Sequence, residues 1–428
     1  MIRFVTLLLL TSWFTTAALA ENWPRFRGPT GQGISAETNL PAEWNATQNV
    51  AWKTPIAGEG WSSPIVWENR VFLTVARQGG TTCHVVALDR DTGKVLWDVR
   101  VFEQSPGRKE GRNSYATPTP VTDGQRVYAF FGGGGAAAVD FDGKIAWTNT
   151  EESYYSQHGL GASPILYNDL LIMPWDHNTR PGPNTRVGWQ IPWDKSYVWA
   201  LDKNTGKERY RAKRGMSRIG HQTPNIVEVD GKPQLISAAG DVIQGFVPET
   251  GERLWSVESN GEAVTPSPVF GNGMVFSSSG FPTGFGGRSF KATLRAFRLG
   301  GGTGDLTKAN LVWEHTQAVP MIPSLLFADG LLYSIKEDGQ FQCLDPADGT
   351  VIYKQKLRGS YSASPVFADG RIYILGDDGT TTVIAPGREF KRIASNELGE
   401  RTQASMAVSG GRLFIRTDKQ VYCIKKAE

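Results

Sequence analysis

The sequence predicts an all-β protein, an eight-bladed β-propeller of four-stranded antiparallel blades whose last blade is closed by an N-terminal strand. Three observations predict this fold. A turn phrase that ends on an aromatic residue recurs along the chain, and a Ser/Thr-Pro phrase precedes its copies at blade-like intervals. The final repeat also lacks a strand that the beginning of the chain can supply.

The first twenty residues have the pattern of a secretory signal peptide. Arg3 precedes an apolar stretch over residues 4–14, and small residues end the segment at Ala18-Leu19-Ala20. The apolar stretch is shorter than the ~20 residues that span a bilayer. We therefore expect cleavage after Ala20, a periplasmic or secreted protein, and no membrane insertion.

Charge argues against a nucleic-acid partner. The chain has 45 basic and 42 acidic residues, a formal charge of +3, and no basic run.

The three cysteines, Cys83, Cys343 and Cys423, are far apart in the sequence and form no metal-binding or disulfide motif. We expect buried structural cysteines and a monomer.

The clearest copy of the turn phrase runs from Ala87 to Trp97, and places a turn containing Asp89 and Gly93 between two strands. Glycine adopts positive φ at little energetic cost, so this pattern predicts a β-hairpin turn. Further copies are at 138–147, 200–210, 245–255 and 343–353.

The Ser/Thr-Pro phrase marks the first strand of each blade. Its eight starts, separated by 41 to 60 residues, are Ser63, Thr117, Ser163, Thr223, Ser267, Ile322, Ser364 and Ser405, the last without proline. Each interval holds four short strands, which is the content of one blade.

The last repeat ends near Ile424 without its fourth strand, whereas residues 50–53, with the aromatic Trp52, stand before the first blade. Pairing of residues 50–53 with residues 404–425 would close the ring and remove its exposed sheet edges. The expected organisation is a signal peptide (1–20), an N-terminal extension (21–49) and a single propeller domain (50–428).

The pattern Ala87-x-Asp89-x-x-x-Gly93-x-x-x-Trp97 resembles the repeat of the pyrroloquinoline-quinone (PQQ)-like propellers, which include quinoprotein alcohol dehydrogenases and the propeller lipoprotein of outer-membrane barrel assembly. The opening Trp23-Pro24-Arg25-Phe26-Arg27-Gly28-Pro29 is similar to that of exported proteins of this family. The resemblance implies that the strand-closing aromatics dock between blades, namely Trp52, Trp97, Trp147, Tyr210, Trp255, Trp313 and Tyr353.

Function is expected on the face opposite the Asp/Gly turns, because the long loops are predicted there, at 98–114, 148–161, 174–196 and 277–291. Aromatic, arginine and histidine side chains suit a planar, anionic or sugar-like ligand. The residues just before the inner strands are the candidates for ligand binding or for simply filling the channel mouth: Trp61, Arg112, Tyr115, His158, Arg218, His221, Glu262, Met321, Tyr361 and Arg401.

The insertion from Pro174 to Asp194 is dense in Trp, Asp and Pro, and is either a lid or docking surface or a self-packed loop. The glycine runs at 132–135 and 300–304 lack the residues of a phosphate loop. The acidic turns lack the glutamate of a calcium loop and the histidines lack zinc spacing, so no metal site is predicted.

Two functions remain open at this stage. The first is a non-catalytic scaffold that presents its loop-rich face to a protein, glycan or small ligand. The alternative, which the resemblance implies, is a PQQ-dependent dehydrogenase that holds the quinone and Ca²⁺ and oxidises an alcohol or sugar. The sequence has no adjacent cysteine pair like the one found in many such dehydrogenases. No cofactor is therefore assigned.

Overall fold

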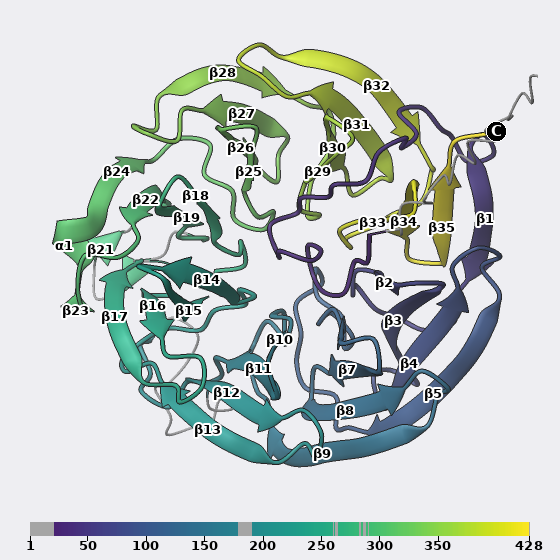
Figure 1. The fold of residues 1–428 in the computed structure, drawn as a ribbon, viewed down its shortest axis with the longest axis horizontal. Coiled ribbons are helices and arrows are strands. Elements are labelled where there is room, and N and C mark those ends of the chain that lie inside the picture. The colour runs from purple at the N-terminus through teal and green to yellow at the C-terminus, as the bar shows by residue number, and fades with distance from the viewer. Residues whose placement is uncertain are drawn as a thin grey trace, which may run out of the picture.

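The computed structural model describes residues 21–178, 191–259, 261, 264–281, 284–285, 288–289 and 291–427. In this part of the chain the strands form nine sheets, and eight of them are arranged as a ring (Figure 1). The four strands of each blade pair antiparallel, and in the first seven blades they run outwards from the centre in chain order. The predicted fold class, an all-β eight-bladed propeller, is therefore confirmed.

The first four blades follow each other along the chain. Blade 1 contains β2 (Ile65–Trp67), β3 (Arg70–Arg77), β4 (Thr82–Asp89) and β5 (Val95–Glu103). Blade 2 contains β6 (Val121–Thr122), β7 (Arg126–Phe130), β8 (Gly134–Asp140) and β9 (Ile145–Ser153). Blade 3 contains β10 (Ile165–Tyr167), β11 (Leu170–Trp175), β12 (Tyr197–Asp202) and β13 (Glu208–Lys213). Blade 4 contains β14 (Asn225–Val229), β15 (Lys232–Ala238), β16 (Val242–Phe246) and β17 (Arg253–Glu258).

The other four blades complete the ring. Blade 5 contains β18 (Val269–Gly271), β19 (Met274–Ser278), β22 (Leu294–Arg298) and β24 (Leu311–His315). Blade 6 contains β25 (Leu326–Ala328), β26 (Leu331–Ile335), β27 (Gln340–Leu344) and β28 (Val351–Lys356). Blade 7 contains β29 (Val366–Ala368), β30 (Arg371–Leu375), β31 (Thr380–Ala385) and β32 (Lys391–Glu397). Blade 8 contains β33 (Ala407–Ser409), β34 (Arg412–Arg416), β35 (Gln420–Lys425) and β1 (Val50–Pro55).

Blade 8 is built from both ends of the chain. Strand β1 pairs antiparallel with β35, with Val50 opposite Ile424 and Trp52 opposite Cys423. This confirms the predicted closure. The pairing supplies the last blade with its outer strand, and the chain then continues from β1 into blade 1, which closes the ring.

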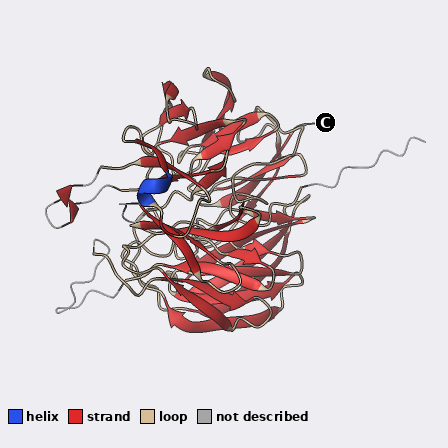
Figure 2. Cartoon of the chain, turned by 60° about the vertical axis from the view of Figure 1, so that its left-hand side comes forward, coloured by secondary structure: helices blue, strands red, loops and turns tan. Residues whose placement is uncertain are grey.

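Blade 4 departs from the four-stranded expectation. A short strand, β23 (Gly304–Asp305), pairs in parallel with the outer edge of β17 and is followed by the helix α1 (Thr307–Asn310). The glycine run at 300–304 therefore belongs to a sheet-edge segment. A second addition, the hairpin of β20 (Gly284–Phe285) and β21 (Arg288–Ser289), projects beyond the blades (Figure 2).

The core lies between the blades, in a series of apolar clusters that each join neighbouring sheets. In β12, Tyr197, Trp199 and Leu201 pack towards blade 2, whereas Val198 and Ala200 pack towards blade 4. Alternate residues of a strand face opposite sides of its sheet, so each inner strand supplies two clusters. The three cysteines are fully buried in these strands, in line with the structural role expected for them.

The strand-closing aromatics join each blade to the next. The indole Nε1 atoms of Trp52, Trp97 and Trp147 donate to carbonyl oxygens in the turn of the following blade, at 2.8 to 2.9 Å. Tyr210 and Trp313 make the corresponding bonds to Pro248 and Pro346, at 2.6 and 2.8 Å. This hydrogen bond to the following blade is therefore found in five of the seven positions.

Trp255 and Tyr353 differ for local reasons. Trp255 donates to Gln234 Oε1 of its own blade, at 2.7 Å, because blade 5 has the glycine-rich segment instead of an Asp/Gly turn. A Cβ atom on Gly245 would lie 2.3 Å from the Trp255 indole, so the ring folds over its own sheet. Tyr353 packs against Phe341 of its own blade and Phe390 in the turn of blade 7. Trp255 lies in an apolar cluster with Phe297 of blade 5, so both residues still dock between blades.

The turn glycines have a second function besides their backbone conformation. Gly206 has a φ of 72°, and a Cβ atom placed on it would lie 2.5 Å from the indole of Trp147 in the preceding blade. Gly93 stands in the same relation to Trp52, also at 2.5 Å. The turn must therefore lack a side chain for the aromatic residue to reach the carbonyl beside it.

The N-terminal segment, residues 21–49, crosses the middle of the ring (Figure 1). It pairs with blade 1 between Trp23 and Val66, accepts a bond from Thr122 of blade 2, and meets blade 7 at Phe367. The Arg25 guanidinium donates to Asn225 of blade 4 at 2.8 Å. One extended segment thus ties together inner strands from opposite sides of the ring.

Replacing Gly206 with alanine should destabilise the protein more than replacing Gly231. Both glycines have a φ of 72°, but nothing lies within 4 Å of a Cβ on Gly231. The shared backbone strain costs about 1–2 kcal/mol. Overlap with Trp147 should add about 1–3 kcal/mol to G206A alone. Urea unfolding measures the difference, and equal losses would contradict the proposed role of the glycine in docking.

Candidate functional site

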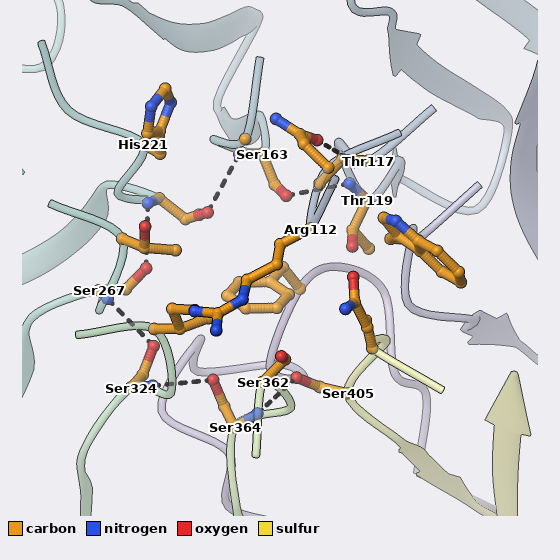
Figure 3. A pocket seen from close by; sticks show the side chains of 18 of the residues that line it. Arg112, Thr117, Thr119, Ser163, His221, Ser267, Ser324, Ser362, Ser364 and Ser405 are labelled. Atoms are coloured by element: carbon orange, nitrogen blue, oxygen red, sulfur yellow. Dashed lines mark hydrogen bonds between the residues drawn. The ribbon is translucent and has the colours of Figure 1, made fainter. Parts of the chain in front are cut away.

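A ring of serine and threonine residues surrounds the centre of the propeller, one from each blade, immediately before its inner strand (Figure 3). We call it the hydroxyl ring: Ser63, Thr119, Ser163, Thr223, Ser267, Ser324, Ser364 and Ser405. In blades 2 and 6 the ring residue follows the predicted blade start, Thr117 or Ile322, by two positions. The hydroxyl of Thr117 instead bonds within its own loop, accepting from Ser114 N at 2.9 Å.

Each ring residue is bonded to the next blade. The backbone N–H of Ser63 donates to the hydroxyl of Thr119 at 2.9 Å, and Thr119 N–H donates to Ser163 at 3.0 Å. The same bond recurs in every step to Ser405, at 2.9 to 3.1 Å. The hydroxyls from Thr119 to Ser405 therefore each use a lone pair within the ring and keep their own proton to donate elsewhere.

The step from blade 8 to blade 1 is made differently. Ser405 and Ser63 are both described, and no hydrogen bond joins them. Instead, the buried Arg416 of blade 8 donates to the carbonyl oxygens of Ser62 and Thr74 in blade 1, at 3.1 and 3.0 Å. Burial lowers the pKa of Arg416 to about 9. A cation therefore bridges the seam at which the ring closes.

The hydroxyl ring lines a pocket of about 680 Å³ at the centre of the molecule. Phe26, from the N-terminal segment, also lines it. Because that segment crosses the channel, the pocket has a floor with an aromatic surface. Trp61 lies on the wall, with the Arg401 guanidinium 5.1 Å from its ring centre.

Arg112 is the cation of the pocket. Its side chain extends into the space between Ser163 and Ser405 (Figure 3). Among the described residues, its guanidinium makes no hydrogen bond or ion pair, and the only carboxylate that lines the pocket is that of the exposed Glu110. The pocket therefore combines one unpaired cation with hydroxyls that can both donate and accept, and it has little negative charge among the described lining residues.

His221 is a buried imidazole in the wall of the pocket, with 6 % of its surface exposed. Neither ring nitrogen has a hydrogen-bond partner among the described residues. Burial, with a smaller contribution from His158, lowers the pKa of His221 to about 3, so the ring is neutral at pH 7. It offers one donor and one acceptor, and its ring centre lies 6.1 Å from that of His158.

The structure brings four of the ten predicted site residues into the pocket, namely Trp61, Arg112, His158 and His221. Five others lie outside its lining. Glu262 lies outside the described residues. The hydroxyl ring was missed because its Ser/Thr-Pro phrase served only as a marker of the repeat.

The five residues outside the pocket lining have local partners. Arg218 is buried and paired with Asp241, with Nε 3.0 Å from both carboxylate oxygens. Tyr361 is buried and donates to Arg358 O at 2.9 Å, and Tyr115 donates to Gly107 O at 3.0 Å. The remaining two residues use other contacts: Met321 N–H donates to Glu337 at 2.5 Å and Arg401 forms an ion pair with Asp418 at 3.6 Å.

The predicted lid or docking segment, Pro174 to Asp194, is described only in part, since residues 179–190 lie outside the described residues. Trp175 is fully buried, with its ring centre 5.0 Å from that of Trp199. Asp176 and Arg214 form a fully buried pair, with Nη2 2.9 Å from Oδ2. Burial raises the pKa of Asp176, and the ion pair and hydrogen bonds with Arg214 oppose that rise. This end of the insertion is packed core.

Two further observations concern the described part of the chain. It contains no group of three or more His, Cys, Asp or Glu side chains arranged to hold a metal ion. Its one helix is far too short to cross a membrane.

Comparison with known structures finds proteins of similar fold. The crystal structure of BamB from Moraxella catarrhalis has a TM-score of 0.57 and 12% identity, over 87% of this chain and 99% of that one. The computationally designed Ika8 protein has a TM-score of 0.56 and 14% identity, over 92% and 99%. The quinohemoprotein alcohol dehydrogenase from Comamonas testosteroni has a TM-score of 0.45 and 13% identity, over 95% and 81%, too distant a likeness to bear on function. At these identities the likenesses concern the fold alone.

No curated protein matches the sequence significantly. A family described as outer membrane protein assembly factor BamB matches residues 34–157 and 305–389, which include blade 1 and the repeats of blades 6 and 7. Together with the eight-bladed ring, the match supports a place for this chain among the PQQ-like β-propeller repeat proteins.

Proposed function

We propose that the protein is an exported, non-catalytic binding protein that uses its loop-rich face and holds an anionic, oxygen-rich small ligand, such as a sugar acid, in the central pocket. The observation that carries this proposal is the hydroxyl ring around Arg112. Its hydroxyls have protons to donate, and the Arg112 guanidinium has no partner among the described residues.

The donor set favours an anion. A guanidinium matches a carboxylate with two parallel hydrogen bonds, and such charge-assisted bonds are stronger than neutral ones. The ring hydroxyls point inwards from around the pocket and would bind further oxygens. Phe26 and Trp61 supply flat apolar surfaces that suit the face of a sugar or planar ring.

The alternative is a PQQ-dependent dehydrogenase assisted by Ca²⁺, and the described pocket fits it poorly. Ca²⁺ binds roughly six to eight oxygen ligands, with carboxylates prominent among them. Among the described lining residues only Glu110 carries a carboxylate. The residues present therefore do not form a Ca²⁺ site, and we derive no redox step through a quinone.

The family match supports a binding role over a catalytic one. The matching family is described as an outer membrane protein assembly factor, and a protein partner at the same loop-rich face is compatible with a ligand in the pocket. We further propose cleavage after Ala20, a periplasmic or secreted location, a monomer, and a propeller domain over residues 50–428 preceded by the 21–49 extension.

Ligand binding should depend on Arg112. Calorimetric titration with D-glucuronate, beside D-glucose as its neutral counterpart, should give saturable binding of the acid only. R112Q should weaken that binding at least about tenfold, which corresponds to about 1.4 kcal/mol. R392Q is the matched control, because Arg392 is an exposed arginine on the outer strand β32.

Two outcomes would contradict the binding proposal. The first is that none of the acids glucuronate, galacturonate and citrate binds more tightly than its neutral counterpart. The second is saturable binding of PQQ with Ca²⁺ followed by dye reduction with alcohols or sugars, which would establish the dehydrogenase.

His221 should make the protein less stable in acid. Its folded pKa, about 3, lies below the ordinary histidine pKa of about 6.5, so in acid the unfolded chain takes up a proton that the folded chain does not. Stability from this group is full above about pH 6.5 and falls as the pH drops, by up to about 1.4 kcal/mol per pH unit. Urea unfolding of H221Q between pH 7 and pH 4 should show a shallower loss than the unmodified protein.

The matched control for H221Q is H315Q. His315 is partly exposed and its pKa is lowered less strongly by burial, so its replacement should change the pH profile much less. If H221Q and the unmodified protein lose stability in parallel, His221 is protonated in the folded state and is not the neutral group inferred for the pocket.

A further inference from the structure

We propose that the carboxylate of Glu37 is a binding site for the α-ammonium group of a chain that begins at Glu21, and that this contact fixes the start of the mature chain to blade 8. The inference rests on the proposed cleavage after Ala20. It concerns a different part of the molecule from the central pocket and does not depend on the ligand.

Three backbone nitrogens converge on Glu37. Oε1 accepts from Glu21 N at 2.6 Å and from Gly410 N at 2.6 Å, and Oε2 accepts from Gly411 N at 3.0 Å. Gly410 and Gly411 form the turn between β33 and β34, and both have positive φ. The carboxylate thus already holds the first hairpin of blade 8.

The backbone nitrogen of Glu21 is held in position by its own side chain. Glu21 Oε2 accepts from Ser35 Oγ and, at 3.1 Å, from Ala36 N. Glu37 N donates to Ser35 Oγ at 3.1 Å, so Ser35 links the two glutamates. Residues 21 and 35–37 therefore form a compact cluster in which the Glu21 nitrogen faces the Glu37 carboxylate.

Cleavage before Glu21 would change the chemistry of this contact. A peptide N–H donates one neutral hydrogen bond, whereas the α-ammonium has three protons and a positive charge below its usual pKa of about 7.7–8.0. Hydrogen bonds between ionised partners are roughly twice as strong as neutral ones. The contact with Glu37 would become an ion pair with hydrogen bonds.

Blade 8 is where such a contact has the largest structural effect. It is the blade assembled from both ends of the chain, and the N-terminal segment connects Glu21 to β1 of that same blade. An ion pair at Glu37 would hold this segment at its beginning, while β1 holds it at its end. Processing of the chain would therefore strengthen the closure of the ring.

The test compares two chain starts. One protein begins at Glu21, released from a fusion that leaves no extra residue, and the other retains Ala20 and so moves the ammonium one residue away. Each is made with Glu37, with E37Q, and with E43Q as the control, because Glu43 is an exposed glutamate of the same segment. Thermal unfolding is measured for all six proteins.

The chain that begins at Glu21 should melt higher than the Ala20 chain, by about 2 °C. The difference should disappear in E37Q and remain in E43Q. The α-amine of Glu21 should also react with an acylating reagent at neutral pH at least about fivefold more slowly than in E37Q, a readout that does not depend on how stable the variant is.

Equal melting temperatures for the two chain starts, or a difference that persists in E37Q, would overturn the Glu37 site. Mass spectrometry of the protein recovered after export tests the processing step separately. A mature chain beginning at a residue other than Glu21 would overturn the biological part of the proposal, because the site would then never meet an ammonium group.

Discussion

The hydrogen bond from the backbone of one blade to the ring hydroxyl of the next is the interaction on which the rest of the structure depends. It recurs from Ser63 to Ser405 with nearly constant length, so it fixes the spacing of the inner strands. The aromatic residue that reaches the turn of the next blade performs the same function on the outside. Each blade is thus held to its neighbour at two radii, and the apolar clusters fill the space between.

The same hydroxyls give the pocket its chemistry. Because the hydroxyls from Thr119 to Ser405 each accept a bond from a neighbouring blade, each keeps its own proton to donate towards the centre. The N-terminal segment turns this open channel into a pocket by placing Phe26 across it. Arg112 and the neutral His221 then set the charge, with no carboxylate deep in the pocket among the described residues. Architecture and ligand preference therefore have one physical origin.

The fold could be predicted because the repeated turn glycines and strand-closing aromatics indicate the number of blades. The additional strand around Trp52 indicates how the ring is closed. The site could be predicted only in part. Position before an inner strand places a residue near the channel but does not say where its side chain points, since Arg218 turns to Asp241 and Tyr361 into the core. In blade 6 the predicted blade start, Ile322, lies two positions before the ring residue, Ser324. The proline there precedes Ser324, whereas in most other blades it follows the ring residue.

The central claim is that the hydroxyl ring and Arg112 form a binding site for an anion. The most direct measurement is a crystal structure of the mature protein grown with D-glucuronate. The account predicts the sugar acid above Phe26, with its carboxylate paired to Arg112 and its oxygens within hydrogen-bond distance of ring hydroxyls. An empty pocket at saturating ligand, or a sugar acid bound only elsewhere on the surface, would contradict it.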